Sequence, residues 1–314
     1  MFLPQGWRMD LVDVADPVEK FETMVRCAQE AERAGFDAVW LYDHFHTVPS
    51  PQLETTFECW TSMGALARET RTIRLGQMVT CNSYRPPSLL AKMASCIDVM
   101  SHGRLNFGIG AGWYEQEYVA YGYDFPDTPE RLRMLRESLQ VIRAMWSEDR
   151  ADFNGGRYRL RGAINEPKPV QKPHPPIWVG GGGEKVTLKL VAQYGDGCNL
   201  NADVDTVRHK LDVLRGHCDA VGRDYASLIK SIEFYAILGD EREIDRVVRD
   251  TARRSGTDAD FVRKWHPFAG NASRLAELIH GYTELGVDYV IVNLPNAAEG
   301  GVIERFAAEV VPLL

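Results

Sequence analysis

The chain is short of positive charge, with 36 lysines and arginines against 44 aspartates and glutamates, a formal net charge of -8. A protein that binds nucleic acid needs a basic surface to neutralise phosphates, and no cluster of basic residues occurs along this chain. We therefore expect no nucleic-acid partner.

Long apolar runs are also missing. No stretch of about 18 apolar residues occurs, so we expect no helix that crosses a membrane. Residues Met1–Gly6 lack a basic region followed by an apolar stretch, and they do not resemble a secretory signal. The six cysteines are scattered without a C-x-x-C pair, which is typical of small core residues in a reducing compartment. These features predict a soluble cytoplasmic protein.

The chain does contain a regular alternation of short β-branched or aromatic runs with amphipathic helical stretches. This alternation is typical of βαβ units and a parallel sheet. The expected strands are Phe2–Leu3, Ala38–Tyr42, Ile73–Val79, Arg104–Ile109, Ile177–Gly180, Gly197–Leu200, Lys230–Leu238 and Tyr289–Asn293. The clearest expected helices are Pro17–Gly35, Pro86–Met100, Arg131–Trp146, Ala269–Gly286 and Glu299–Leu314.

Eight strands, each followed by a helix, fit an α/β fold of the closed (β/α)8 TIM barrel type better than an open sheet. An open doubly wound sheet would carry G-x-G-x-x-G directly after its first strand, where this chain has Pro4-Gln5-Gly6. No linker divides the chain, so we expect one domain over residues 1–314. The segments Thr47–Phe57 and Gly110–Pro176 exceed an ordinary βα connection, and we expect insertions there over the C-terminal mouth of the barrel.

An acid–imidazole pair, Asp43-His44, follows the second expected strand directly. In a barrel the C-terminal ends of the strands carry the catalytic groups. His44 can take or give the proton that accompanies a hydride transfer, and Asp43 can fix the ring or accept from a polar cofactor edge. The alternative is an ordinary helix cap followed by a loop histidine. His46 completes an H-x-H pattern, but later strand ends carry glycine and asparagine instead of further ligands, so we expect no metal site.

Two glycine-rich segments end further strands. Gly108–Gly112 alternates glycine with other residues, and Gly180–Gly183 precedes a helix that we expect to begin at Glu184, with Lys185 in its first turn. Glycines let a ligand approach the backbone, and free N–H groups before a helix form an anion site. Together they favour a ligand with a flat ring and a phosphate tail, although a tight turn alone would explain either segment.

At these residues the sequence resembles the luciferase-like monooxygenase superfamily, and within it the branch that uses coenzyme F420. The resemblance extends from Phe2 to about Asn201, with a looser match through the last helices. The segments that carry it are Phe2–Gly6, Ala31–Asp37, Asp43–Phe45, Thr72–Gly76, Tyr84–Pro87, Ser101–Leu105, Gly108–Trp113, Pro175–Gly181 and Gly195–Gly197.

The resemblance implies a role for individual residues. His44 matches a histidine beside the deazaflavin ring that serves as proton donor or base, and Asp43 matches a carboxylate that contacts the cofactor. Met78–Val79 matches a bulge, often with a non-prolyl cis peptide, that supports the ring from behind. The remaining matches are positions around the ring and linker, Cys81, Ala111, Gly112 and Gln116, and positions of the phosphate-binding loop, Gly180, Gly181 and Gly183.

The sequence also departs from the sugar-phosphate dehydrogenases of this superfamily. Trp113 stands where they have a proton-donating glutamate, and Asn199–Ala202 stands where they have a phosphate-binding lysine. These departures argue against a sugar-phosphate substrate. Trp60, Trp113 and Asn199 are our candidates for the substrate pocket, whose aromatic edge would suit an apolar or conjugated molecule.

The leading interpretation is an oxidoreductase that transfers a hydride between coenzyme F420 and a small organic substrate, with reduction by F420H2 favoured over oxidation. The first alternative is an FMN-dependent monooxygenase on the same barrel. The second is a barrel that binds a small ligand without turnover, against which the retention of Asp43, His44 and both glycine segments argues. The resemblance further implies a homodimer.

Overall fold

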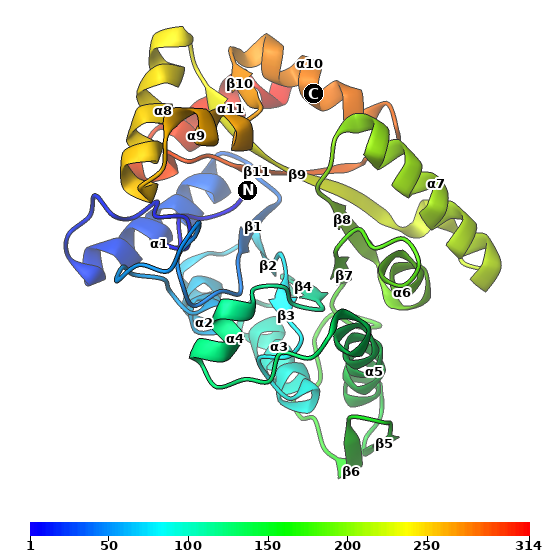
Figure 1. Ribbon diagram of the computed structural model, residues 1–314. Helices are drawn as coiled ribbons and strands as arrows, with labels where there is room; N and C mark the ends of the chain where they lie inside the picture. Colours follow the sequence, from blue (N-terminus) through cyan, green and yellow to red (C-terminus); the bar gives the residue numbers. More distant parts are fainter.

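The computed structural model describes the whole chain, residues 1–314, and its centre is a sheet of parallel strands (Figure 1). Seven strands follow one another around the sheet, each paired in parallel with the next. They are β1 (Ala38–Leu41), β2 (Arg74–Gln77), β4 (Leu105–Gly110), β7 (Ile177–Gly180), β8 (Gly197–Leu200), β9 (Ile229–Leu238) and β11 (Tyr289–Asn293).

The N-terminal segment is the eighth strand and closes the sheet. The N–H of Phe2 donates to Val292 O of β11 at 2.8 Å, and the N–H of Leu3 donates to Trp40 O of β1 at 3.1 Å. The N–H of Trp40 donates back to Met1 O at 2.9 Å. Because this segment bonds to both edges of the sheet, the predicted (β/α)8 barrel and its eight strands are confirmed.

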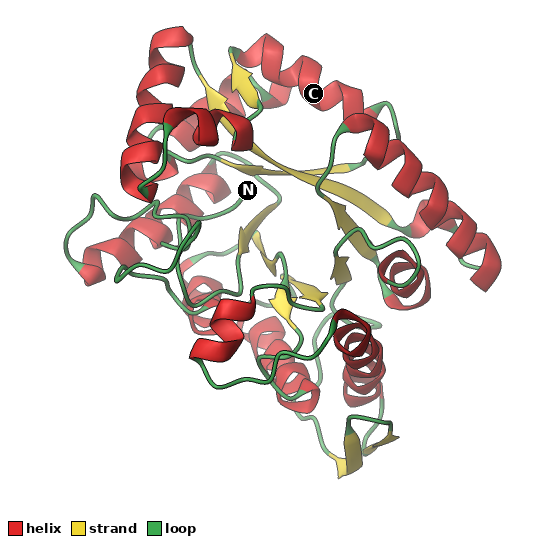
Figure 2. Cartoon of the chain, viewed as in Figure 1, coloured by secondary structure: helices red, strands yellow, loops and turns green.

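Eleven α-helices surround the sheet, most of them on the outside of the barrel (Figure 2). They are α1 (Pro17–Arg33), α2 (Cys59–Glu69), α3 (Pro87–Met100), α4 (Glu115–Ala120), α5 (Thr128–Ser147), α6 (Thr187–Tyr194), α7 (Val204–Val221), α8 (Glu241–Ser255), α9 (Ala259–Trp265), α10 (Ala272–Thr283) and α11 (Val302–Glu309). The predicted start at Pro17 is confirmed, because the Asp16 side chain accepts from the N–H groups of Val18 and Glu19 and so caps the helix. None of the helices has the length and apolar character that crossing a membrane requires.

The predicted helix start at Glu184 is wrong. Helix α6 begins at Thr187, three residues later. The Glu184 carboxylate lies near His209 and Lys210 of α7, at 3.4 and 3.6 Å, and does not cap a helix. Lys185 is exposed in the turn before α6 and is absent from the lining of the cavity described below.

Residues 110–176 divide into three parts. Helix α4 lies near the mouth, whereas α5 packs outside the barrel against α3, and Trp146 Nε1 donates to Ala91 O at 3.1 Å. The antiparallel hairpin β5 (Ala151–Asn154) and β6 (Arg159–Ala163) projects beyond α5 (Figure 1). The expectation that this whole segment covers the mouth is therefore wrong for α5, which occupies the ordinary helix position after β4.

A second insertion follows β9 and was not predicted. It consists of α8, α9 and the short strand β10 (Phe268–Gly270), which pairs in parallel with the end of β9. Its residues add one wall to the cavity at the mouth. Below the mouth the barrel is filled by aromatic side chains, of which Trp40 and Trp178 meet edge to face at 5.1 Å and are almost fully buried. The barrel is therefore closed at its bottom and open only at the top.

Candidate active site

A cavity of about 600 Å³ lies at the C-terminal ends of the strands. This position is where active sites of barrels are found. The predicted residues that line it are Asp43, His44, Met78, Val79, Cys81, Gly112, Trp113, Gly180, Gly181 and Asn199. The sequence therefore located the cavity through residues from β1, the segment after β2, β4, β7 and β8.

His44 forms a pair with Glu117, a residue of α4 that the sequence analysis did not single out. His44 Nδ1 lies 2.8 Å from Glu117 Oε2. The other oxygen, Oε1, accepts from the backbone N–H groups of Phe45 at 2.7 Å and His46 at 2.8 Å. The Tyr84 hydroxyl donates to Oε2 at 2.6 Å. One buried carboxylate thus fixes both the ring of His44 and the loop that carries it.

The charge of Glu117 bears on which nitrogen of the His44 ring is engaged by the protein. Burial opposes ionisation of Glu117, but hydrogen bonding with His44, the charge of its ring and the bonds from His46 and Tyr84 together hold the pKa of Glu117 below its ordinary value. An ionised Glu117 accepts the proton on Nδ1, so Nε2 is the atom left to exchange a proton. The Trp7 ring stacks on His44 at 4.4 Å and keeps it oriented.

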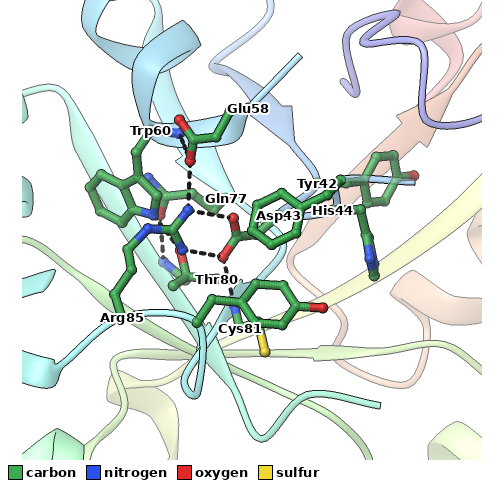
Figure 3. Close-up of polar contacts among 12 residues, drawn as sticks. Tyr42, Asp43, His44, Glu58, Trp60, Gln77, Thr80, Cys81 and Arg85 are labelled. Carbon is green, nitrogen blue, oxygen red and sulfur yellow. Dashed lines mark hydrogen bonds and ion pairs between the residues drawn. The ribbon is translucent and has the colours of Figure 1, made fainter. Parts of the chain in front are cut away.

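Asp43 is engaged by the protein itself (Figure 3). Its carboxylate accepts from both guanidinium nitrogens of Arg85, at 2.7 and 2.9 Å, and from the N–H of Cys81 at 2.9 Å. Arg85 also bonds to Glu58, the N-cap of α2, at 2.5 Å. The Asp43 side chain has no exposed surface. Asp43 therefore lines the cavity as expected, and its carboxylate ties the end of β1 to Cys81 and, through Arg85, to α2; its contact with the coenzyme stays a prediction.

The segment after β2 forms the bulge that the resemblance implied. The Met78–Val79 peptide is cis, and β3 (Thr80–Cys81) resumes pairing with β4 beyond it. A Cβ on Gly110 or Gly180 would lie 2.7 Å from Val79 Cγ2. These two glycines are therefore needed to admit the Val79 side chain, a role that neither the ligand nor the turn interpretation had included.

The thiol of Cys81, just beyond the bulge, contacts Tyr118. Its sulfur lies 3.0 Å from the Tyr118 hydroxyl, and burial raises its pKa to about 12. Cys81 is therefore a neutral thiol at physiological pH, and it shapes the wall without serving as a nucleophile.

The glycine loop after β7 meets a lysine that the sequence analysis missed. Gly180, Gly181 and Gly182 line the cavity, and Lys210 of α7 donates from Nζ to Gly182 O at 2.6 Å. Lys210 lines the same part of the cavity and is largely buried. A cation beside a loop of glycine backbone is a site suited to a phosphate. This lysine provides the positive charge that we had expected from Lys185.

Four predicted residues lie outside the cavity lining. Trp60 is buried behind the bulge, where its Nε1 donates to Thr80 Oγ1 at 3.1 Å, so its assignment to the substrate pocket is wrong. Gln116 is exposed on α4, because the neighbouring position, Glu117, is the one that faces inward. Ala111 packs against the main core, and Gly183 is exposed one residue beyond the loop.

The two other substrate-pocket candidates do line the cavity. Trp113 is 62% exposed, stacks on Tyr114 at 5.0 Å and meets the His44 ring edge to face at 5.6 Å. Asn199 donates from Nδ2 to Glu233 at 3.2 Å. Glu233 belongs to β9, and burial raises its pKa above the ordinary value. Asn199 and Glu233 therefore form a polar pair in the cavity wall, and the sequence did not predict the part of Glu233 in it.

No group of three or more histidine, cysteine, aspartate or glutamate side chains is placed to hold a metal ion. His46, the second histidine of the H-x-H pattern, lies beside the Tyr121 ring at 5.5 Å and outside the cavity lining. The arrangement at the mouth offers instead one oriented imidazole, a bulged wall and a phosphate-type loop.

Comparison with protein families gives one match that spans most of the chain. The model of the family described as "Luciferase-like monooxygenase" matches residues 2–289. Among individual relatives, the "F420-dependent glucose-6-phosphate dehydrogenase" of Kineococcus radiotolerans is 28% identical over 91% of each chain. The "F420-dependent hydroxymycolic acid dehydrogenase" of Mycobacterium tuberculosis is 32% identical over 73% of this chain and 63% of that protein.

Solved structures show the same fold. An "F420-dependent secondary alcohol dehydrogenase in complex with an F420-acetone adduct" superposes with a TM-score of 0.79 and covers 95% of both chains at 22% identity. At that identity the likeness concerns the barrel and its insertions, not the choice of substrate.

Proposed function

The chain belongs to the luciferase-like monooxygenase family, and from this premise we propose that it transfers a hydride between coenzyme F420 and a small organic substrate. We favour the direction in which F420H2 reduces the substrate. The observation that carries the proposal is the His44–Glu117 pair at 2.8 Å, at the mouth of the barrel beside the Met78–Val79 bulge.

The residues around the cavity fit coenzyme F420. Val79 supports a flat ring from one side, because Gly110 and Gly180 leave its side chain room to protrude. The loop Gly180–Gly182 and Lys210 suit the phosphate of the tail. When bound, the coenzyme supplies or accepts the hydride, and the protein has to provide binding, orientation and a proton carrier.

His44 is the proposed proton carrier. With Nδ1 bonded to Glu117, its Nε2 can give a proton to the substrate as the hydride arrives, or take the proton of a substrate hydroxyl in the opposite direction. Trp7 and Trp113 flank the ring and limit the access of water to it. We assign the other predicted cofactor positions, Asp43 and Cys81, to holding the wall in place.

The FMN-dependent alternative has less support, because relatives along most of the chain carry names that specify F420. A sugar phosphate is also a poor candidate for the substrate. Asn199 near the end of β8 and Asn201 just after it stand where a lysine is absent, and both bond to Glu233. A cationic phosphate site is therefore missing at that strand end.

The variant His44→Ala tests the proposal. Coenzyme affinity should change little, because the wall and the loop hold the ring and phosphate, whereas single-turnover hydride transfer should fall by about 10²–10⁴-fold. His46→Ala is the matched control, since His46 lies two residues away and outside the cavity lining. A normal transfer rate per folded molecule in His44→Ala, even with a lowered thermal midpoint, would remove His44 from the mechanism.

Three broader proposals rest on family membership and composition. We propose that the chain is a single domain over residues 1–314, which should unfold in one transition. A homodimer formed through outer helices is proposed as well, and sedimentation at micromolar concentration would reveal a monomer if this is wrong. A cytoplasmic location agrees with six free cysteines, five of them buried.

A further inference from the structure

Arg8 lies at the mouth of the barrel with little to bind. It follows the N-terminal strand and lines the cavity, and its guanidinium sits over the rings of Tyr235 at 4.2 Å, Trp7 at 4.6 Å and Tyr42 at 5.7 Å. Its one hydrogen bond goes to the Tyr235 hydroxyl, and its Nε is buried without any partner. We call this arrangement the Arg8 cage.

Two other arginines with little exposed surface, Arg85 and Arg104, are fully engaged. Arg85 makes two bonds to Asp43 and one to Glu58. Arg104 bonds to backbone carbonyls and the Thr70 hydroxyl through all of its nitrogens. Arg8 has no carboxylate at ion-pair distance, although a buried charge without a partner is costly. The chain therefore keeps donors free at Arg8 that it satisfies elsewhere.

The acids nearest the Arg8 cage, Glu233 and Asp10, attract Arg8 from beyond ion-pair distance, and their hydrogen bonds go to other groups. Glu233 is turned to Asn201 and Asn199, at 3.0 and 3.2 Å, and burial raises its pKa. Asp10 accepts from the N–H of Gly6 at 2.7 Å, and burial raises its pKa too. Both carboxyl groups thus have a reduced tendency to carry negative charge, whereas a guanidinium stays charged at any physiological pH.

A second arginine faces the same part of the cavity. Arg254 of α8 is buried, donates to Pro295 O at 2.8 Å, and lies 4.0 Å from the nearest carboxylate, that of Asp13. Asp13 is already bonded twice by the exposed Arg253, at 2.8 and 2.9 Å. Arg254 also donates to Thr251 Oγ1 at 3.2 Å, so Arg8 is the arginine of this side of the cavity that has no carboxylate at ion-pair distance and keeps donors for an anion.

Exposed aromatic side chains line the same cavity as Arg8 and Arg254. Phe261 and Trp265 of α9 line the cavity and remain 39% and 46% exposed. Large aromatic side chains left open toward a cavity are typical of a wall that a ligand covers. Our proposed phosphate site, the loop Gly180–Gly182 with Lys210, lies at the end of β7 and on α7. The Arg8 cage is built instead from residues of the N-terminal segment, the end of β1 and β9. The phosphate site and the Arg8 cage can therefore bind two different anionic groups in the same cavity.

We propose that the substrate is an aromatic or conjugated carboxylic acid whose carboxylate binds Arg8. The planar guanidinium can form two parallel hydrogen bonds with a carboxylate, and Arg254 adds charge from α8. The apolar body of the substrate packs against Trp7, Phe261 and Trp265. This inference rests on the proposed function, since it identifies the substrate class of the same cavity.

The test compares matched ligands on protein loaded with F420. Benzoate, trans-cinnamate and naphthoate are titrated by calorimetry, each beside its carboxamide, which has the same shape without the charge. At least one carboxylate should bind at least about 10-fold more tightly than its amide, and Arg8→Gln should remove this preference. Arg133→Gln, the loss of an exposed guanidinium on α5 outside the cavity lining, is the control that should leave the preference unchanged.

Two further measurements make the result decisive. F420 affinity should be the same in Arg8→Gln and the wild type, and an equal loss of F420 and carboxylate binding would mean that Arg8 holds the coenzyme instead. Arg8→Lys retains charge in the cage if the glutamine variant does not fold, and it should keep only part of the preference. Absence of carboxylate preference across all three pairs, or a full preference in both Arg8 variants, overturns the inference. Failure of the wild type to bind F420 would instead overturn the proposed function.

Discussion

Replacing Glu117 by glutamine should disturb the orientation of the His44 ring while leaving the histidine itself in place. The carboxylate accepts four hydrogen bonds, two at each oxygen, and its side chain has no exposed surface. An amide has one accepting oxygen and one donating nitrogen, so it cannot satisfy both pairs of donors.

Each orientation of the new amide has a defined cost. If its nitrogen faces the backbone N–H groups of Phe45 and His46, two buried donors lose their partner. If its nitrogen faces His44, the ring has to accept at Nδ1, so it can neither become the imidazolium that gives a proton from Nε2 nor take a proton there in the opposite direction. With charge-assisted bonds contributing about 1.5–3 kcal/mol each, we expect the free energy of unfolding to fall by about 2–4 kcal/mol.

The rate of hydride transfer per folded molecule should fall as well, by more than a loss of stability alone would cause. A histidine held in the wrong tautomer loses most of its contribution to proton transfer, so single-turnover hydride transfer should slow by about 10²–10⁴-fold. F420 affinity should remain close to that of the wild type. Glu115→Gln, on the exposed face of the same helix, is the matched control.

The stability difference should also depend on pH. Because the folded-state pKa of Glu117 lies below its ordinary value of 4.5, its stabilising effect is fully present above that value and is lost as the pH falls through the folded-state pKa. Denaturant unfolding of the wild type and of Glu117→Gln should therefore show a difference in the free energy of unfolding that narrows below pH 4.5. A Glu117→Gln enzyme with a wild-type transfer rate per folded molecule would refute the role assigned to the pair.

Two further predictions concern the wall and the loop of the cavity. Gly180→Ala should weaken F420 binding, because the added methyl would lie 2.7 Å from Val79 Cγ2, and Val79→Ala in the same chain should partly restore affinity; equal affinities in fluorescence titrations of Gly180→Ala and wild type would contradict this. Lys210→Gln should reduce F420 affinity by about 10-fold through loss of the phosphate contact, whereas Lys189→Gln on exposed α6 should not. If F420 affinity does not respond to Lys210→Gln, the phosphate lies elsewhere.

The barrel could be predicted because its signals are local. Each buried strand is a short apolar run, and the turns between strands and helices carry proline or glycine, so even the two-residue strand Phe2–Leu3 was placed correctly. The insertion after β9 was missed, because α8 is largely polar, α9 has only 7 residues, and neither continues the βα alternation.

The site was predicted only as far as its motifs extend. His44 and the glycine segments stand in motifs, whereas Glu117 and Lys210 are ordinary helical residues that reach His44 and the glycine loop, respectively, through tertiary packing. Gln116 was given by the resemblance alone, whereas Glu117 is the position that faces inward; adjacent positions of a helix point in different directions, and the sequence alone does not reveal which one does so. The charge excess at Arg8 was invisible for the same reason, since it depends on which acids do not reach it.

The choice of coenzyme is the claim on which the rest depends. Apo-protein should be titrated in parallel with F420 and with FMN, and the dissociation constants compared under one buffer condition. The account predicts that F420 binds more tightly by at least about 10-fold, a difference of about 1.4 kcal/mol. Equal affinity, or tighter binding of FMN, would contradict it.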